Sequence, residues 1–150
     1  MNGVYISESN KIEGVYDLSE VMQSNKAWDY LKEVDALNFS EMFECHRLIM
    51  ANLRSDIAGK LRKVNVWVGG RKCPNPGSVK RGLMMLLYKV PPTTALKALD
   101  WHITFEKIHP FEDGNGRTGR MIYWWHCKRL GLTPILFTAE HRQGYYSLFD

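Results

Sequence analysis

The chain has 150 residues, a length that fits one domain with a single sizeable core. Hydrophobic residues make up 45% and charged residues 24%, which excludes a disordered or fibrous chain. The N-terminus lacks the basic and apolar regions of a signal peptide, and the longest apolar run, residues 83–88, is far shorter than the ~20 residues that a membrane span needs. With three cysteines and no C-x-x-C pair, the composition predicts a reduced, cytoplasmic protein without a membrane span.

The net charge of +4 is unevenly distributed. Residues 1–53 hold four basic and nine acidic side chains, residues 54–89 hold nine and one, and residues 90–150 hold seven and six. The middle segment should attract an anion: a nucleotide, an acidic protein surface or the acidic N-terminal part of the same chain. A solvated basic face is the alternative, and charge alone gives no argument for nucleic-acid binding.

Apolar periodicity predicts a mostly helical chain. Residues 19–37 fit one or two helices, with the strongest repeat over residues 27–37, and Ser40 is placed to cap a helix over residues 41–53. Further helices are predicted over residues 78–88, from Thr93 or Thr94 to about His109, over residues 117–130, and, capped by Thr138, near the C-terminus.

The period changes to two over residues 63–68, which predicts a short strand. Gly69 and Gly70 are a turn signal, so residues 71–73 would return as a second short strand. Three valines alternate along the first strand: Val64, Val66 and Val68. The sequence thus predicts a mostly α fold with one small hairpin.

The most informative segment, His109-Pro-Phe-Glu-Asp-Gly-Asn-Gly-Arg-Thr-Gly-Arg120, joins two predicted helices. Backbone N–H groups of a glycine loop at a helix N-terminus bind anions, and Gly114 and Gly116 let phosphate oxygens approach the backbone. Arg117 and Arg120 lie on the first helical turn, where two guanidinium groups can hold two successive phosphates. The segment therefore predicts a site for a polyphosphate.

Three other side chains of this segment suggest chemistry or support. Asp113 offers a hard oxygen to Mg²⁺, and His109 has the ordinary pKa of a general base at neutral pH. Phe111, apolar within a polar loop, is expected to anchor the loop to the core. The spacing Glu106-x-x-His109 also fits half of a di-metal helical bundle, but no second such pair occurs.

His109-Pro-Phe-x-Asp113-Gly-Asn-Gly-Arg117-x-x-Arg120 resembles the Fic signature, H-x-F-x-[DE]-G-N-G-R-x-x-R, at every signature position. The resemblance extends over roughly residues 5–149 and implies one Fic domain over residues 1–150, a compact and mostly α bundle with a β-hairpin flap. Its expected parts are an inhibitory helix region (1–18), the flap (62–73), and the catalytic loop with the helix start (109–120).

The resemblance implies a protein adenylyltransferase that moves AMP from ATP to a Tyr, Thr or Ser hydroxyl of a target protein. His109 would deprotonate the hydroxyl, and Asp113 would hold Mg²⁺ or Mn²⁺. Gly114, Asn115 and Gly116 would form the phosphate nest, Arg117 and Arg120 would hold the β- and γ-phosphates, and the flap valines Val64, Val66 and Val68 would line up the target. Gly116 stands where the related Doc kinases carry Lys, which favours nucleotidyl transfer.

A second motif, Ser9-Asn-Lys-Ile-Glu13-Gly14, resembles the Fic inhibitory motif [ST]-x-x-x-E-[GN]. In that family its Glu pairs with the second signature Arg, here Arg120, so that the γ-phosphate loses its anchor. Glu13 is then a brake, a residue that helps hydrolyse AMP from the target, or both. Two other functions stay open: a nucleotide-binding or partner-docking module without turnover, and Fic-type transfer of another phosphate-linked group. A homo-oligomer also stays open.

Overall fold

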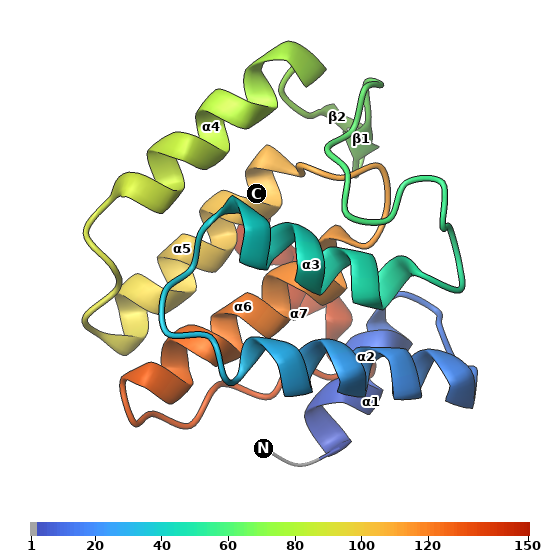
Figure 1. Cartoon of the computed structure of the whole chain (residues 1–150), viewed down its shortest axis with the longest axis vertical. Coiled ribbons are helices and arrows are strands. Elements are labelled where there is room, and N and C mark those ends of the chain that lie inside the picture. The colour runs from blue at the N-terminus through green and yellow to red at the C-terminus, as the bar shows by residue number, and fades with distance from the viewer. Residues whose placement is uncertain (1–2) are drawn as a thin grey trace.

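Helix α6 runs through the centre of the protein in the computed structural model, which describes residues 3–150 (Figure 1). The helices and strands are α1 (Gly3–Ile12), α2 (Leu18–Leu31), α3 (Phe39–Met50), β1 (Trp67–Val68), β2 (Arg71–Lys72), α4 (Pro76–Tyr88), α5 (Ala95–Ile108), α6 (Asn115–Arg129), α7 (Arg142–Tyr146) and the 3₁₀ turn η1 (Ser147–Phe149). The predicted mostly α fold with a small hairpin is confirmed.

The central position of α6 explains its sequence. Helices α1, α2, α3 and α5 all contact α6, and every residue from 117 to 127 is buried. A helix enclosed on all sides needs no amphipathic stripe. Two adjacent tryptophans, Trp124 and Trp125, are accordingly both in the core, and Trp124 packs edge-on against Trp28 of α2.

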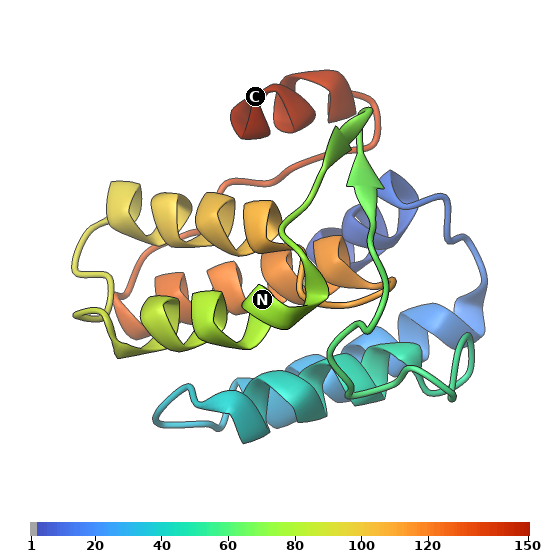
Figure 2. The same ribbon diagram turned by 90° about the horizontal axis from the view of Figure 1, so that it is seen from above.

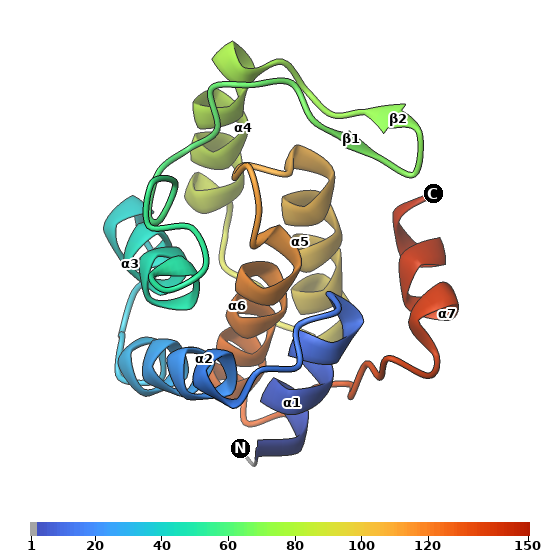
Figure 3. The ribbon, with the colours of Figure 1, turned by 90° about the vertical axis from the view of Figure 1, so that its right-hand side faces the viewer.

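Figure 2 shows the bundle as layers, with α2 and α3 on one side of α6 and α5 on the other. Helix α4 packs along α5, and the short α7 lies beyond the bundle, beside the hairpin. Figure 3 shows the tip of the hairpin close to the C-terminal helix. Within residues 3–150, none of the helices combines the length and the apolar character that crossing a bilayer requires.

The helix predicted through residue 37 ends earlier, because the segment after Leu31 makes contacts that a helix could not. Trp125 Nε1 donates a hydrogen bond to the backbone oxygen of Val34 (2.9 Å), and Arg129 donates one to the backbone oxygen of Asp35. Val34 and Leu37 still pack on the core. Their periodic spacing therefore reports burial in a loop and not a continuing helix.

Several predicted boundaries also shift. Helix α3 begins two residues before the predicted start, because Asn38 and not Ser40 is its N-cap and the Glu41 carboxylate accepts the Asn38 N–H at 3.0 Å. Helix α7 has His141 and not Thr138 at its N-cap. Thr94 is confirmed as the cap of α5, since its hydroxyl accepts from the Lys97 N–H.

The hairpin is present but shorter than predicted. Its ladder pairs Trp67 with Lys72 and Val68 with Arg71, turning at Gly69 and Gly70, which both have positive φ. The segment before Trp67 is not a strand. There the Val64 backbone oxygen accepts a hydrogen bond from the Arg62 guanidinium (3.0 Å), which holds the base of the hairpin in an irregular conformation.

Candidate active site

The segment between α5 and α6 is a loop closed by Asn115. The Asn115 Oδ1 accepts the Phe111 N–H, and its Nδ2 donates to the Phe111 backbone oxygen, both at 2.8 Å. Gly114 caps α6 with φ 83°, a conformation that favours glycine. Both polar atoms of the Asn115 side chain bond the loop, and the residue is buried, so the role of this side chain here is to hold the loop closed.

His46 of α3 supports this loop from below, a role that the sequence did not indicate. Its ring stacks on Phe111 at 3.7 Å, and its Nδ1 accepts the Gly59 N–H at 2.9 Å. The proton is therefore on Nε2, which donates to the Asp113 backbone oxygen at 2.8 Å. Burial lowers the pKa of His46 to about 4, so the ring is neutral at pH 7. The predicted anchoring role of Phe111 is confirmed, since this side chain is fully buried.

His109 ends α5 in a left-handed conformation, φ 51° and ψ 64°, the only non-glycine residue of positive φ within residues 3–150. Its N–H donates to the Phe105 backbone oxygen, and its Nδ1 lies 3.3 Å from the Glu106 backbone oxygen. A proton on Nδ1 leaves Nε2 free as a base. Burial lowers the pKa of His109, which keeps the ring neutral at pH 7.

Arg62 fastens the end of α5 to the base of the hairpin. Its guanidinium donates to the backbone oxygens of four residues: His109 (2.6 Å), Ile108 (3.3 Å), Val64 (3.0 Å) and Pro74 (2.5 Å). Arg62 is buried and is part of the basic middle segment. One residue of that segment thus serves the site as support and not as an anion binder.

Arg117 and Asp113 lie at the start of α6. Arg117 is buried, and its Nε has no hydrogen-bond partner within residues 3–150. Its Nη2 contacts the Met50 sulfur (3.5 Å) and lies 3.8 Å from Asp113 Oδ1. A buried guanidinium with an unused donor suits an anionic ligand. Asp113 is 60% exposed, and its Oδ1 accepts the Gly114 N–H at 2.8 Å.

Asp113 fits the predicted metal ion as a single carboxylate ligand. Within the described chain no group of three or more His, Cys, Asp or Glu side chains could hold a metal ion by itself. Mg²⁺, however, is commonly bound by one or two carboxylates together with substrate phosphates. The site offers one exposed carboxylate, Asp113, beside the buried Arg117. This arrangement fits a metal ion held by one carboxylate and substrate phosphates, and it does not fit a metal ion held by protein side chains alone.

Arg120 joins the two sequence motifs of the site through its hydrogen bonds. It is 1% exposed, and it donates to Ser9 Oγ (2.8 Å), the Ser9 backbone oxygen (3.0 Å), Glu13 Oε1 (2.7 Å) and the Tyr145 hydroxyl (3.1 Å). Burial opposes its charge, but Tyr145 and Glu13 outweigh burial and raise its pKa. The two sequence motifs, 107 residues apart at Glu13 and Arg120, therefore meet in one buried cluster.

Glu13 reaches this cluster from a turn just after α1. Gly14, with φ 70°, ends that turn and has open space around it. A Cβ placed on Gly116 would lie 2.1 Å from Glu13 Oε1. The Glu13 carboxylate thus rests against the backbone of Gly116, at the N-terminus of α6, where an anion would bind.

These residues border a cavity of about 560 Å³, within the usual range for small-molecule sites. Glu13, His109, Gly116 and Arg120 line one side, while the hairpin tip and the C-terminal aromatic residues line the other. Tyr145 is buried and its hydroxyl lies 2.8 Å from Nε2 of His102, so Tyr145 is a structural partner of Arg120. The signature from His109 to Arg120 does not predict the hydrogen bond between Arg120 and Tyr145.

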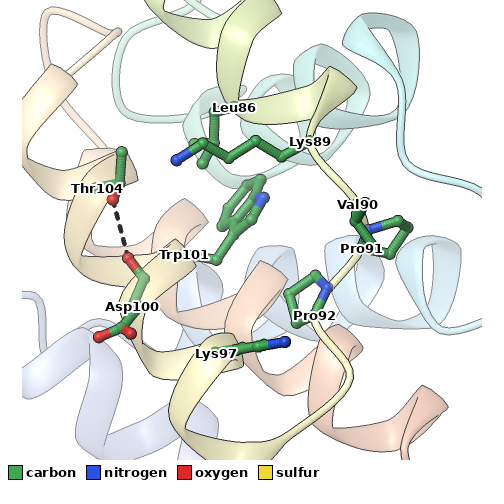
Figure 4. A pocket seen from close by; sticks show the side chains of 9 residues that line it. All are labelled: Leu86, Lys89, Val90, Pro91, Pro92, Lys97, Asp100, Trp101 and Thr104. Carbon is green, nitrogen blue, oxygen red and sulfur yellow. Dashed lines mark hydrogen bonds between the residues drawn. The ribbon is translucent and has the colours of Figure 1, made fainter.

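Another cavity, of about 350 Å³, lies between the end of α4 and α5 (Figure 4). Its walls are Leu86, Trp101 and the Val90-Pro91-Pro92 turn, with two lysines at its edge, and Thr104 donates a hydrogen bond to the Asp100 backbone. The residues that line it include none of the predicted site residues, so the chemistry belongs to the cavity at His109.

A family model described as the Fic/DOC family matches residues 36–127. This match covers more than half of the chain and includes the loop from His109 to Arg120, and the chain belongs to the Fic/DOC family. Helix α1, which carries Ser9, and helix α7, which carries Tyr145, lie outside the matched residues.

Curated relatives are longer than this chain. The chain is 26% identical over 152 residues to "Protein adenylyltransferase Fic" of Culex quinquefasciatus, a match that covers 97% of the chain and 30% of the relative. It is 30% identical over 122 residues to "Protein adenylyltransferase fic-1" of Caenorhabditis elegans, covering 77% and 24%. The chain thus spans about 30% of the length of such relatives.

Solved structures show the same fold. Fic-1 (residues 134–508) from C. elegans superimposes with a TM-score of 0.80 at 23% identity, over 99% of this chain and 56% of that one. A Fic domain containing signaling protein from Bacteroides thetaiotaomicron gives 0.81 at 20% identity, over 97% and 69%.

Proposed function

We propose that this chain is the catalytic domain of a protein adenylyltransferase, which moves AMP from ATP to a Tyr, Thr or Ser hydroxyl of a target protein. The observation that carries the proposal is the joint placement of a neutral His109, the buried Arg120 and the helix N-terminus at Gly116 around one cavity. The buried Arg117 follows Gly116 directly on α6. The adenylyltransferase names of the relatives support it.

In the proposed reaction, His109 Nε2 takes the proton of the target hydroxyl while the hydroxyl oxygen attacks the α-phosphorus of ATP. The bond from the α-phosphorus to the bridging oxygen breaks, and pyrophosphate leaves. Arg117 and Arg120 hold the β- and γ-phosphates, and backbone N–H groups at residues 114–116 neutralise the developing charge. Asp113 would hold Mg²⁺ or Mn²⁺, which supplies additional positive charge beside the phosphates.

The hairpin would present the target. Trp67 and Val68 of β1 are exposed, and among residues 3–150 β1 pairs only with β2, on one side. An extended target segment could pair with the open edge and place its hydroxyl near His109. Val68 lines the cavity, while Val64 lies at the base of the hairpin, so Val68 is the flap valine with the more direct contact.

We also propose that Glu13 is a brake. Its carboxylate occupies Arg120 and the Gly116 backbone, the two groups that a terminal phosphate would need. A phosphate that entered beside it would meet a like charge. ATP could then bind only with its phosphates displaced from the orientation that transfer requires.

The experiment is self-modification with α-labelled ATP and Mg²⁺, comparing the wild type with Glu13→Gly and with Glu13→Gly/His109→Ala. We expect strong labelling of Glu13→Gly alone, by at least ~10-fold over the wild type, because losing a charge-assisted bond of about 1.5–3 kcal/mol frees Arg120. Labelling that survives His109→Ala would refute the role of His109. ATP binding without labelling would favour a binding module or another transferred group.

A further inference from the structure

Glu106 is an acidic side chain of the cavity that the proposed transfer does not use. It lies one helical turn before His109 on α5 and lines the same cavity. Its Oε1 is buried and has no hydrogen-bond partner among residues 3–150. A Cβ on Gly119 would lie 2.3 Å from this oxygen, so the carboxyl fills a space that exists only because residue 119 is glycine.

The surroundings of Glu106 favour an uncharged carboxyl. Arg120 gives its hydrogen bonds to Ser9, Glu13 and Tyr145, and none to Glu106. The titratable or charged groups that interact with Glu106 or line the cavity with it are Glu13 after α1, Arg71 and Cys73 at the hairpin, His109 at the end of α5, Arg120 on α6, Tyr145 and Tyr146 on α7, and Asp150. A buried negative charge on Glu106, beside the Glu13 carboxylate, would be costly.

The pKa of Glu106 agrees with this reading. Burial raises it to about 8, Arg120 opposes the rise, and Glu13 adds to it. The carboxyl therefore carries a proton at pH 7 and can donate a hydrogen bond.

Two glycines of α6 show where the Glu106 proton lies relative to a bound anion. Gly116 and Gly119 are one turn apart on the same helix, and the Glu13 carboxylate contacts the first while the Glu106 carboxyl contacts the second. An anion that displaces Glu13 from Arg120 thus arrives beside Glu106. An ionised Glu106 would repel that anion, whereas a protonated one would bind it.

We propose that Glu106 is a nucleotide-binding residue whose protonated carboxyl donates a hydrogen bond to the anion that replaces Glu13 on Arg120. The inference rests on the proposed function in taking this anion to be the terminal phosphate of ATP. It follows that nucleotide binding requires one proton on Glu106. Affinity should then fall above the pKa of that carboxyl, towards about tenfold per pH unit.

The test measures the Kd of ATP and of inorganic pyrophosphate by calorimetry, between about pH 6 and about pH 9. We compare Glu13→Gly with Glu13→Gly/Glu106→Gln, and Glu13→Gly/Glu140→Gln is the control because Glu140 is exposed and outside the cavity. We expect Kd to rise with pH in the first and third proteins and to stay flat with pH in the second. Because Glu13 adds to the raised pKa of Glu106, the rise should begin at a lower pH in these Glu13→Gly proteins than the pKa of Glu106 in the wild type.

A further variant separates hydrogen bonding from charge. Glu106→Met fills a similar space with neither a proton nor a donor, so it should give a flat pH profile with binding about fivefold weaker than Glu13→Gly at pH 7. This variant also serves if Glu106→Gln does not fold. Thermal melting of each protein reports whether the fold is retained.

Each outcome decides between the proposals. Parallel pH profiles with and without Glu106 would overturn the role of Glu106 and leave the transferase intact. If Kd changes with pH as expected but Glu13→Gly transfers no label, the proposed transferase activity is overturned and the role of Glu106 in nucleotide binding stands. Failure of Glu13→Gly to bind either anion would overturn both.

Discussion

The backbone at His109 is held by one distant side chain, Arg62. Four backbone oxygens accept its hydrogen bonds, two at the end of α5 and two at the base of the hairpin. A planar fork can reach all four at once, whereas an ammonium group is a single point with three donors. Arg62 is therefore a positioning residue: it joins His109, the proposed base, to the hairpin that would carry the target.

Replacing Arg62 by Lys tests this geometry. The charge stays, but at least one buried carbonyl loses its donor, so we expect the free energy of unfolding in urea to fall by about 1–3 kcal/mol. In the Glu13→Gly background, label transfer should fall while the Kd of ATP changes little, because no phosphate contact is lost. The exposed neighbour Lys63→Ala is the control. An unchanged transfer rate in Arg62→Lys would show that the link to the hairpin is dispensable.

At the scale of elements, the position of α1 decides whether Arg120 is free. The helix is held by Ile6 and Ile12 in the core, by the Tyr5 hydroxyl on the Pro134 backbone oxygen, and by the Glu8 carboxylate on the Ala139 N–H. Ser9 adds two acceptors to Arg120. The proposed brake thus includes the whole of α1, and Glu13 lies in the turn that follows the helix.

Ser9→Ala should weaken that brake without removing it. The Arg120 Nε then loses its acceptor inside the protein, a loss of about 1 kcal/mol. We expect basal labelling to rise about fivefold, less than in Glu13→Gly. Ser7→Ala on the same helix is the control, since Ser7 is not a partner of Arg120. If Ser9→Ala instead labels more weakly than the wild type, Ser9 supports catalysis and not inhibition.

The elements also show how far sequence reasoning reached. Thr94 and the Pro after His109 mark both ends of α5 correctly, because these signals are local to the helix termini. The prediction of a helix after Leu31 is wrong, since two backbone oxygens of this segment accept hydrogen bonds from Trp125 and Arg129, about 90 residues later. Periodicity records which side chains are buried and does not record which partners the backbone finds.

The candidate site shows the same difference between local signals, which the sequence carries, and distant contacts, which it does not. The motif from His109 to Arg120 could be identified because its chemistry is concentrated in twelve neighbouring residues. His46 and Arg62 could not, because each is isolated in the sequence and gains its role only through contacts with that loop. For Tyr145, the hydrogen bond to Arg120 is visible only in three dimensions. Glu106 was noted for its spacing to His109, but its burial against Gly119 is visible only in three dimensions.

At the scale of the whole molecule, buried titratable groups set the pH dependence of stability. Burial lowers the pKa of His46 and His126 to about 4 and of His102 to about 3, so all three are neutral in the fold. Unfolded histidines take up protons below about pH 6.5, so stability from these groups is present above that pH and is lost as the pH falls.

Glu106 acts in the opposite direction. Its raised pKa of about 8 means that the folded protein holds a proton that the unfolded chain releases above about pH 4.5. Its contribution to stability is therefore complete in acid and is lost as the pH rises to about 8. Burial raises the pKa of Glu20 in the same direction.

These opposing effects predict a maximum of stability near about pH 6.5. Below it, His46, His102 and His126 outweigh Glu106, and these four groups make the free energy of unfolding rise with pH by about 3 kcal/mol per pH unit, the slope for two protons. His109, with its lowered pKa, adds to this slope, and Glu20, with its raised pKa, opposes it. Above it, Glu106 dominates, and stability should decline by about 1.4 kcal/mol per pH unit until about pH 8.

Urea unfolding of the wild type, Glu106→Gln and the control Glu140→Gln would measure both slopes. Because a glutamine cannot release the proton, Glu106→Gln should keep the acid limb and lose the decline. A wild type whose stability rises steadily to pH 8 would show that Glu106 is ionised in the fold, and the same proton could not then serve a bound phosphate.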